Sequence, residues 1–251
     1  MREGNLIHYH GTPIGGTKQE AAKFLIGRHA LIPFSYPVDL PIALDVCQSF
    51  CLDNGAFTAW KKGESVDFDS YLKWVNSVRS HPSFDWCLIP DVIDGDEKDN
   101  IDLVMLWLRI GPKAKGVPVW HLHESLEWLE WLVDRFEWVA IGSSGQWSNP
   151  GSGGWWKRID EVMAVTCDEL GRPKCKLHGL RMLNPTIFTR LPLSSADSTN
   201  AAMNSGSLKR FGQYTPPTVS QRAEVIAERI ESNNSSAVYV SSDQTDLELF
   251  W

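Results

Sequence analysis

Residues 117–141 read VPVWHLHESLEWLEWLVDRFEWVAI, and this stretch contains one complete strand–helix–strand unit. Its two ends, Val117–Trp120 and Trp138–Ile141, are short apolar runs typical of buried strands. Between them one apolar stripe recurs at helical spacing, formed by Leu126, Leu129, Val133 and Phe136. Such a stripe predicts an amphipathic helix. A strand, a helix and a second strand in this order form the repeating unit of parallel α/β folds.

The same alternation extends in both directions along the chain. The other predicted strands are residues 6–9, 30–34, 50–52, 86–89, 177–180 and 193–196. Further helical stripes cover residues 68–78, 101–108 and 219–230, the last preceded by Thr218 and Gln221 at capping-box spacing. About eight strands, most followed by a helix, predict an α/β fold, a TIM-like (β/α)₈ barrel that forms one domain over residues 1–251. An open doubly wound sheet is the alternative.

The composition indicates a globular protein, with 43% hydrophobic and 22% charged residues in a chain of 251. No apolar run approaches the roughly 18 residues that a membrane span needs, and the first residues carry no signal-peptide stretch. Five cysteines without paired metal spacing predict reduced thiols. We therefore expect a cytoplasmic protein without membrane contact.

The charge of the chain is uneven. The net charge is −7, yet residues 151–222 hold ten Lys and Arg against five Asp and Glu, a local balance of +5 that leaves −12 for the remainder. An acidic chain is not expected to coat nucleic acid without specificity. A local basic surface in the C-terminal third is compatible with the pattern, and so is an ordinary scatter of surface charge.

Polar residues directly follow seven of the predicted strands. They lie in residues 8–11 (HYHG), 53–55 (DNG), 90–94 (PDVID), 121–124 (HLHE), 142–145 (GSSG), 178–179 (HG) and 194–198 (SSADS). Each stretch alone is compatible with a turn or a helix cap. Seven in succession, at the strand ends where barrels of this type carry their active sites, predict a catalytic centre.

Four of these stretches, in their order along the chain, resemble the tRNA-guanine transglycosylase superfamily. They are LDNGAF at 52–57, IPD at 89–91, WVAIG at 138–142 and SAD at 195–197, and the resemblance covers roughly residues 5–210. The chain looks most like the phage-borne DNA-guanine transglycosylases, which place 7-deazaguanines in DNA. No cysteine follows Cys175, so the zinc-binding insertion of the tRNA enzymes is absent, and their tRNA-binding extension is missing too. Both departures favour DNA as the substrate.

The resemblance implies a glycosyltransferase that exchanges guanine in DNA for a free 7-deazaguanine, either 7-cyano or 7-aminomethyl. Breaking an N-glycosidic bond creates an oxocarbenium-like centre that a carboxylate traps, while a second acid handles the proton of the base. We assign Asp197 as the nucleophile and Asp53 as the general acid/base, which requires both to converge on one pocket. The alternatives are a helix N-cap for Asp197 and a turn-forming residue for Asp53.

The guanine would be recognised by neighbouring strand ends. An ionised Asp91 fits the N1–H and N2–H₂ donors of guanine, although it also suits a helix cap. Phe57 fits stacking on the base, with a core role as the alternative. The other predicted substrate-binding residues are Asn54, His121, Gly142, Ser143 and Gly179. His121 equally suits a structural role, and residues 142–145 lack the lysine of a triphosphate-binding loop. We expect no metal, redox cofactor or ATP.

A DNA path is predicted from basic and aromatic residues in the C-terminal third. Its members are Lys174, Lys176, Arg181, Trp155 and Trp156. Reaching a base inside a duplex would require its extrusion from the stack. A solvated protein face is the alternative for this cluster.

Two other classes of function compete with base exchange. Residues two apart on a strand point the same way, so His8/His10 and His121/His123 are each compatible with a pair of metal ligands. Together with Asp197 they resemble the zinc-binding pattern of metal-dependent amidohydrolase barrels. The other alternative is a noncatalytic barrel that only binds nucleic acid.

Overall fold

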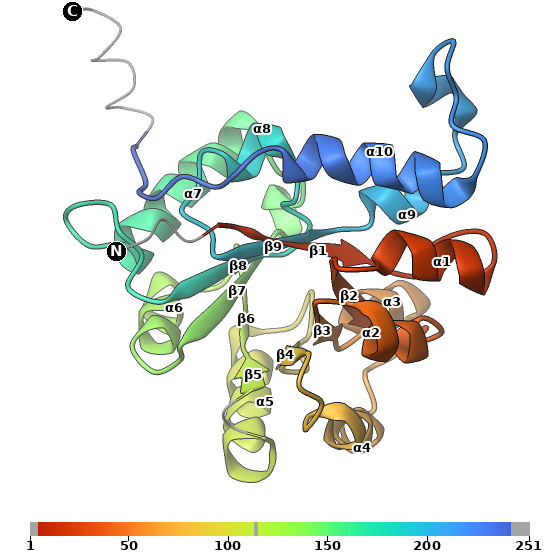
Figure 1. The fold of residues 1–251 in the computed structure, drawn as a ribbon. Helices are drawn as coiled ribbons and strands as arrows, with labels where there is room; N and C mark the ends of the chain where they lie inside the picture. Colours follow the sequence, from red (N-terminus) through yellow and green to blue (C-terminus); the bar gives the residue numbers. More distant parts are fainter. Residues whose placement is uncertain (1–4, 113–114, 242–251) are drawn as a thin grey trace, which may run out of the picture. The chain divides into compact units, whose positions relative to one another are not determined.

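The fold is taken from a computed structural model, which describes residues 5–112 and 115–241. Short parallel strands alternate with helices along the whole described chain (Figure 1). No described helix has both the length and the apolar composition that crossing a membrane requires.

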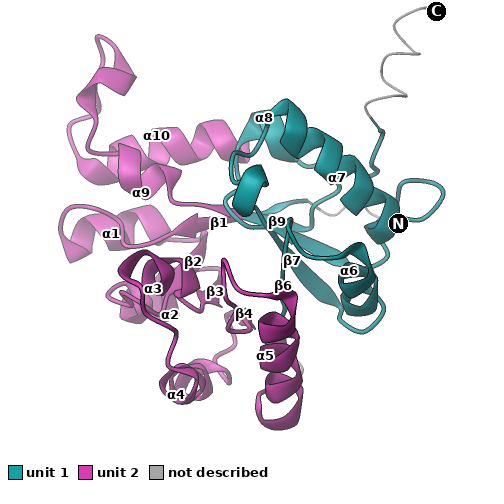
Figure 2. Cartoon of the chain, turned by 180° about the vertical axis from the view of Figure 1, so that it is seen from behind, with its two compact units in different colours: residues 1–7, 118–196, 233–251 teal, residues 8–117, 197–232 magenta. Residues whose placement is uncertain are grey.

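The chain divides into two compact units (Figure 2). The first unit contains residues 1–7, 118–196 and 233–251, and the second contains residues 8–117 and 197–232. The chain passes from one unit to the other within strands β1 and β9. Each unit is described by itself below.

The second unit is built on parallel strands in the order β5-β4-β3-β2-β1. Their bounds are β1 Ile7–Gly11, β2 His29–Pro33, β3 Ser49–Asp53, β4 Phe84–Leu88 and β5 Gly116–Val117. The helices of this unit are α1 Lys18–Leu25, α2 Leu40–Val46, α3 Ala56–Lys62, α4 Phe68–Val78, α5 Glu97–Ile110, α9 Asn200–Asn204 and α10 Val219–Glu231, with the short 3₁₀ helix η3 Leu208–Phe211. Helix α10 packs against both α1 and α9.

The first unit has parallel strands in the order β9-β8-β7-β6. Their bounds are β6 Val119–His121, β7 Trp138–Gly142, β8 Lys176–Gly179 and β9 Ser195–Ser198. Its helices are α6 Leu126–Val133, α7 Gly153–Thr166 and α8 Pro185–Phe188, with the 3₁₀ helix η2 Gly145–Trp147. The core of this unit includes the fully buried Trp120, Trp155 and Phe188.

All eight predicted strands are present, with ends that differ by a few residues. The stretch predicted as one strand at 117–120 is two short ladders, β5 and β6, separated by Pro118. Proline has no backbone N–H to donate, so it interrupts a ladder. The eight predicted strands therefore correspond to the nine strands β1 to β9 of the described residues.

The helix predictions at 68–78, 101–108, 126–136 and 219–230 are confirmed as α4, α5, α6 and α10. The capping box before α10 is confirmed as well, since Thr218 and Gln221 each accept a hydrogen bond from the other's backbone N–H. These helices carry strong local signals, an apolar stripe and a cap.

Substituting Gly116 by alanine is expected to lower the free energy of unfolding by about 1–3 kcal/mol, as overpacking of a filled core does. A Cβ at this position would lie 2.1 Å from Nε1 of the fully buried Trp107. Urea denaturation measures the effect. Gly154→Ala is the matched control, because no atom lies within 4 Å of its Cβ position. A Gly116→Ala protein as stable as this control contradicts the expectation.

Candidate functional site

The two acidic residues assigned to catalysis both belong to the second unit, because the boundary between the units divides β9 after Ala196. Asp53 is the last residue of β3, and Asp197 is the third residue of β9. Cys51 lies two residues before Asp53 on β3, so both side chains point to the same side of the strand. Burial raises the pKa of the Cys51 thiol well above its usual value, and the negative charges of Asp85, Asp197 and Asp53 raise it further. Asp53 and Asp197 are thus both near enough to this buried thiol to affect its pKa, as is Asp85 of β4.

The turn after β3 is formed by residues other than Asp53. Gly55 is the N-cap of α3 and has a left-handed φ of 80°, where a Cβ would also lie 3.2 Å from the backbone nitrogen of Ser35. Asn54 Oδ1 accepts a hydrogen bond of 2.8 Å from the N–H of Ala56. Asn54 and Gly55 make the turn, so the carboxylate of Asp53 is not needed to form it.

Asp197 is not a helix cap. The N-cap of α9 is Thr199, and Ser198 Oγ accepts a hydrogen bond of 2.9 Å from the N–H of Asn200. The side chain of Asp197 is buried, with only 5% of the residue exposed. A buried carboxylate that lies outside the N-cap position is compatible with the nucleophile that the resemblance implies.

Asn54 connects the β3 end to the β4 end. Its Nδ2 donates hydrogen bonds to Asp91 Oδ1 at 2.6 Å and to the carbonyl oxygen of Ile89 at 2.8 Å. Asp96 is the N-cap of α5, so Asp91 does not cap that helix. The half-buried carboxylate of Asp91 is instead held next to the residue that follows Asp53. Asn54 is buried and acts here as a positioning residue for Asp91.

Phe57 lies in the first turn of α3 and is half-buried. Its ring packs against Trp60, with 5.5 Å between the ring centroids, and the Nζ of Lys61 lies 4.3 Å from its centroid. These partners are the residues three and four positions further along the helix. The structure thus shows Phe57 in local helical contacts, and stacking on a base stays a prediction.

The sequence reasoning missed a buried polar network near the amino ends of the strands. Asp85 on β4 accepts hydrogen bonds from the hydroxyls of Tyr9, at 2.5 Å, and Ser49. His29 Nδ1 lies 2.7 Å from Ser49 Oγ. Burial, followed by the charges of Cys51 and Asp85, raises the pKa of Tyr9 well above its usual value. The signal in the sequence is the polar residues at the starts of the predicted strands, whereas the predicted site residues follow the strand ends.

The sequence predicts His8 and His10 as a possible pair of metal ligands on β1. The contacts of His10 place its side chain on the opposite face of β1 from Tyr9. His10 Nε2 lies 2.7 Å from Oε1 of Glu231 on α10, and its ring packs edge-on against Phe24 of α1. His10 thus lies on the side of β1 that these helices cover, where it packs against Phe24 and forms a hydrogen bond with Glu231. Within residues 5–112 and 115–241, no group of three His, Cys, Asp or Glu side chains is placed to share a metal ion.

The Glu231 carboxylate makes the stability of the second unit pH-dependent. Burial acts to raise its pKa, but the hydrogen bond and charge of His10, together with Arg28, outweigh burial and hold the pKa of Glu231 below its ordinary 4.5. A carboxyl group whose pKa is lower in the folded state stabilises the fold above about pH 4.5 and loses this contribution as the pH falls through the folded pKa.

Replacing Glu231 by glutamine is therefore expected to lower the free energy of unfolding at pH 7 by about 2 kcal/mol, the scale of a hydrogen bond to a charged group. The variant should also lose less stability than the unmodified chain between pH 5 and about pH 3. Urea denaturation across this range is the measurement. Glu228→Gln, an exposed position on the same helix, is the control. Equal pH dependence in both variants would show that the ion pair does not contribute.

In the first unit, His121 lies at the end of β6 and is buried. Its backbone N–H donates to Glu124 Oε2 at 2.7 Å, and its ring stacks on that of His123 with 5.7 Å between centroids. A Cβ at Gly142 would lie 3.0 Å from His121 Nδ1, so glycine at 142 lets the imidazole lie against β7. These contacts give His121 and Gly142 a structural role, and substrate binding stays a prediction for each of them.

Ser143 and Gly179 are also engaged in packing. Ser143 Oγ accepts a hydrogen bond of 2.9 Å from Trp155 Nε1. A Cβ at Gly179 would lie 2.8 Å from a methyl carbon of Leu193 and 2.9 Å from Met182 Cβ. Close packing explains the glycine at 179 without any ligand.

The prediction that Trp155 lines a DNA path is wrong. Trp155 is fully buried on the inner face of α7, where its apolar ring is removed from water. Trp156 is half-buried, and the guanidinium carbon of Arg190 lies 4.0 Å from its ring centroid. Arg190 therefore already covers a face of the Trp156 ring on which a base would stack.

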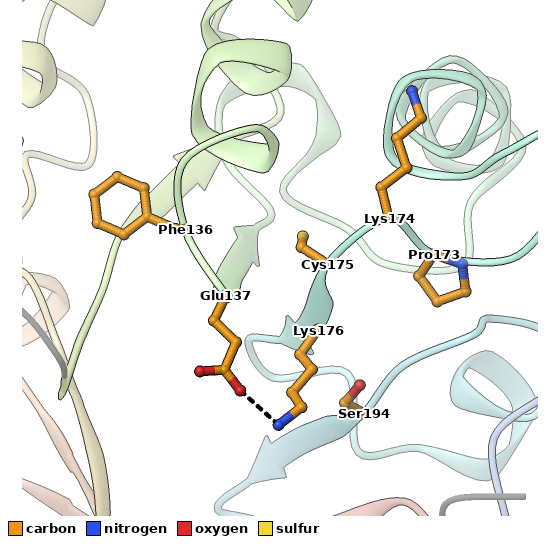
Figure 3. A pocket seen from close by; sticks show the side chains of 7 residues that line it. All are labelled: Phe136, Glu137, Pro173, Lys174, Cys175, Lys176 and Ser194. Atoms are coloured by element: carbon orange, nitrogen blue, oxygen red, sulfur yellow. Dashed lines mark hydrogen bonds and ion pairs between the residues drawn. The ribbon is translucent and has the colours of Figure 1, made fainter. Parts of the chain in front are cut away.

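Lys174 and Lys176 lie at the amino end of β8, away from the strand ends that carry the candidate site residues. They line a cavity of about 400 Å³ together with Cys175 and Glu137, and Lys176 Nζ forms an ion pair of 2.8 Å with Glu137 (Figure 3). Barrels of this class bind their substrates at the carboxyl ends of the strands, so this cavity lies at the opposite end of β8. A DNA contact for these lysines lacks structural support.

Arg181 differs from the other predicted DNA residues. It follows the carboxyl end of β8, is exposed, and has a left-handed φ of 58°. This conformation is uncommon for a residue other than glycine and is found preferentially at functional sites. Its DNA role stays a prediction that this geometry permits.

Comparisons with known proteins support the fold class. No protein-family model matches the sequence, and the comparison with curated proteins gives no match. Among solved structures, the chain is similar to a chain of the tryptophan synthase α2β2 complex from the hyperthermophile Pyrococcus furiosus, with a TM-score of 0.51 and 14% sequence identity. The match covers 91% of this chain and 98% of the other. At this identity the likeness concerns the fold alone, and it confirms the α/β, TIM-like (β/α)₈ class.

Proposed function

We propose that this chain is a DNA-guanine transglycosylase, which exchanges guanine in DNA for a free 7-deazaguanine base. The observation that supports this best is the contact between the β3 and β4 ends, where Asn54, directly after Asp53, holds the Asp91 carboxylate by a hydrogen bond of 2.6 Å. Asp197 is buried at the end of β9 in the same unit. A double-displacement exchange at a sugar carbon requires two carboxylates that converge on that carbon, and these are the roles we assign to Asp53 and Asp197.

The exchange takes two steps. In the first, a carboxylate oxygen of Asp197 bonds to C1′ of the deoxyribose while the bond from C1′ to the guanine nitrogen breaks. Asp53, in its acid form, gives its proton to the departing base. In the second, Asp53 as a carboxylate takes the ring N–H proton of the incoming base, whose nitrogen attacks C1′ and releases Asp197. The proton lost in the first step is regained in the second, so no metal or redox cofactor is needed.

Asp91 would recognise the base. Its carboxylate accepts a hydrogen bond from Asn54, which orients it, and it suits the N1–H and N2–H₂ donors that guanine and 7-deazaguanines share. A base without these donors would leave the carboxylate unpaired, and such a loss discriminates strongly between substrates. This explains how one site would accept both the leaving and the entering base.

The test uses DNA that carries radiolabelled guanine. The protein is incubated with this DNA and with unlabelled guanine, 7-cyano-7-deazaguanine or 7-aminomethyl-7-deazaguanine, and the released label is measured. We expect release that requires a free base, and a protein–DNA adduct that survives denaturation. No release with any of the three bases, including guanine itself, would overturn the proposal.

A further inference from the structure

The second unit carries a protruding segment between α9 and α10. Residues 205–217, here called the arm, include η3 and extend away from the other elements of their unit in both views (Figures 1 and 2). Along the chain, only the short helix α9 separates the arm from Asp197 and Ser198 at the end of β9.

One buried side chain closes the base of the arm. Arg222 on α10 is 9% exposed, and its guanidinium donates hydrogen bonds to the carbonyl oxygens of Ser205, Pro216, at 2.8 Å, and Pro217, at 3.1 Å. These residues are the two ends of the arm. The arm is therefore a closed loop that α10 holds in place.

The surface of the arm combines apolar and basic side chains. Tyr214 is 89% exposed and Leu208 is 58% exposed, and Lys209 and Arg210 are exposed beside them. The sequence from 198 to 223 has no acidic residue, in a chain whose net charge is −7. Large apolar groups left in water next to positive charge, in a segment without acidic residues, indicate a polyanion with stacking surfaces as the partner.

We propose that the arm binds the DNA strand, with Lys209 and Arg210 on phosphates and Tyr214 stacked on a base close to the reacting nucleotide. The position of that nucleotide rests on the proposed function of Asp197. Helix α9 has only five residues, about 7.5 Å in length, so a short connection joins the end of β9 to the start of the arm. The arm thus takes the place of Lys174, Lys176 and Trp155 as the expected DNA contact.

The test measures the binding of fluorescent single-stranded and duplex oligonucleotides by anisotropy at several salt concentrations. The double variant Lys209→Gln/Arg210→Gln is expected to bind about tenfold or more weakly, and the slope of log K against log salt should fall by roughly 1.5–2. Tyr214→Ala should weaken binding by about tenfold. The matched controls are Lys73→Gln/Arg79→Gln on α4 and the exposed Tyr36→Ala, which should bind like the unmodified protein.

Different results would overturn DNA binding by the arm and the proposed base exchange. Arm-dependent DNA binding without any base exchange supports the arm and overturns the exchange reaction. Base exchange whose KM for DNA is unchanged in the arm variants supports the reaction and overturns the arm. Arm variants that alter the oligomeric state in gel filtration while binding DNA normally would assign the arm to protein contacts, which also overturns the inference.

Discussion

Exchange of Asp197 for asparagine is expected to abolish both base exchange and the covalent protein–DNA adduct. The amide cannot bond to C1′ as a carboxylate does, so the first displacement has no nucleophile. Loss of a nucleophile that acts as part of a unit lowers turnover by about 10⁴-fold or more. Release of labelled guanine and denaturing gel electrophoresis measure the two effects.

Asp45→Asn is the matched control for this substitution. Asp45 is exposed on α2, so the variant makes the same change of charge outside the candidate site. It should exchange bases at the normal rate, and both variants should show cooperative thermal unfolding. A noncatalytic protein predicts instead that Asp197→Asn keeps every measurable function, and that result would refute the assignment.

Exchange of Asp53 for asparagine is expected to slow base exchange by about 10²–10⁴-fold, the usual loss when a general acid or base is removed. The pH dependence should change too, because the group that alternates between acid and base is gone. Asp197 remains in this variant, so the adduct should still form, although slowly. Single-turnover rates of label release between pH 5 and 9 are the measurement.

The two variants are distinguished by the adduct. Slow adduct formation with Asp53→Asn and none with Asp197→Asn would match the assigned roles. If Asp53→Asn retained the pH profile of the unmodified protein, another group would be the acid and base. Asp45→Asn again controls for the charge change.

The strands and the main helices could be predicted from the sequence because their signals are local. The alternation of apolar runs and helical stripes depends on side-chain period alone, and α10 also carries its own capping box. The apolar neighbours of Pro118 predicted one strand, but the structure has two, β5 and β6. Proline lacks the backbone N–H that a ladder hydrogen bond needs, and the apolar pattern does not reveal this loss.

The candidate site was predictable in part. The resemblance of four short motifs pointed to Asp53 and Asp197, and the structure places both in one unit, on β3 and β9. It could not be known from the motifs that Thr199, Gly55 and Asp96 would serve as the helix caps. Capping depends on the backbone angles at each helix start, which several residue types satisfy.

Order along the chain and periodicity determined the α/β barrel class of this protein and the ends of the strands where its acidic residues lie. Tertiary structure alone decided which polar and aromatic residues are already engaged. It buried Trp155, bound Lys176 to Glu137 and His10 to Glu231, and left Tyr214 exposed on an arm that Arg222 closes. The physical reason is that burial and pairing depend on partners far away in the sequence, whereas helix and strand periods are set by near neighbours.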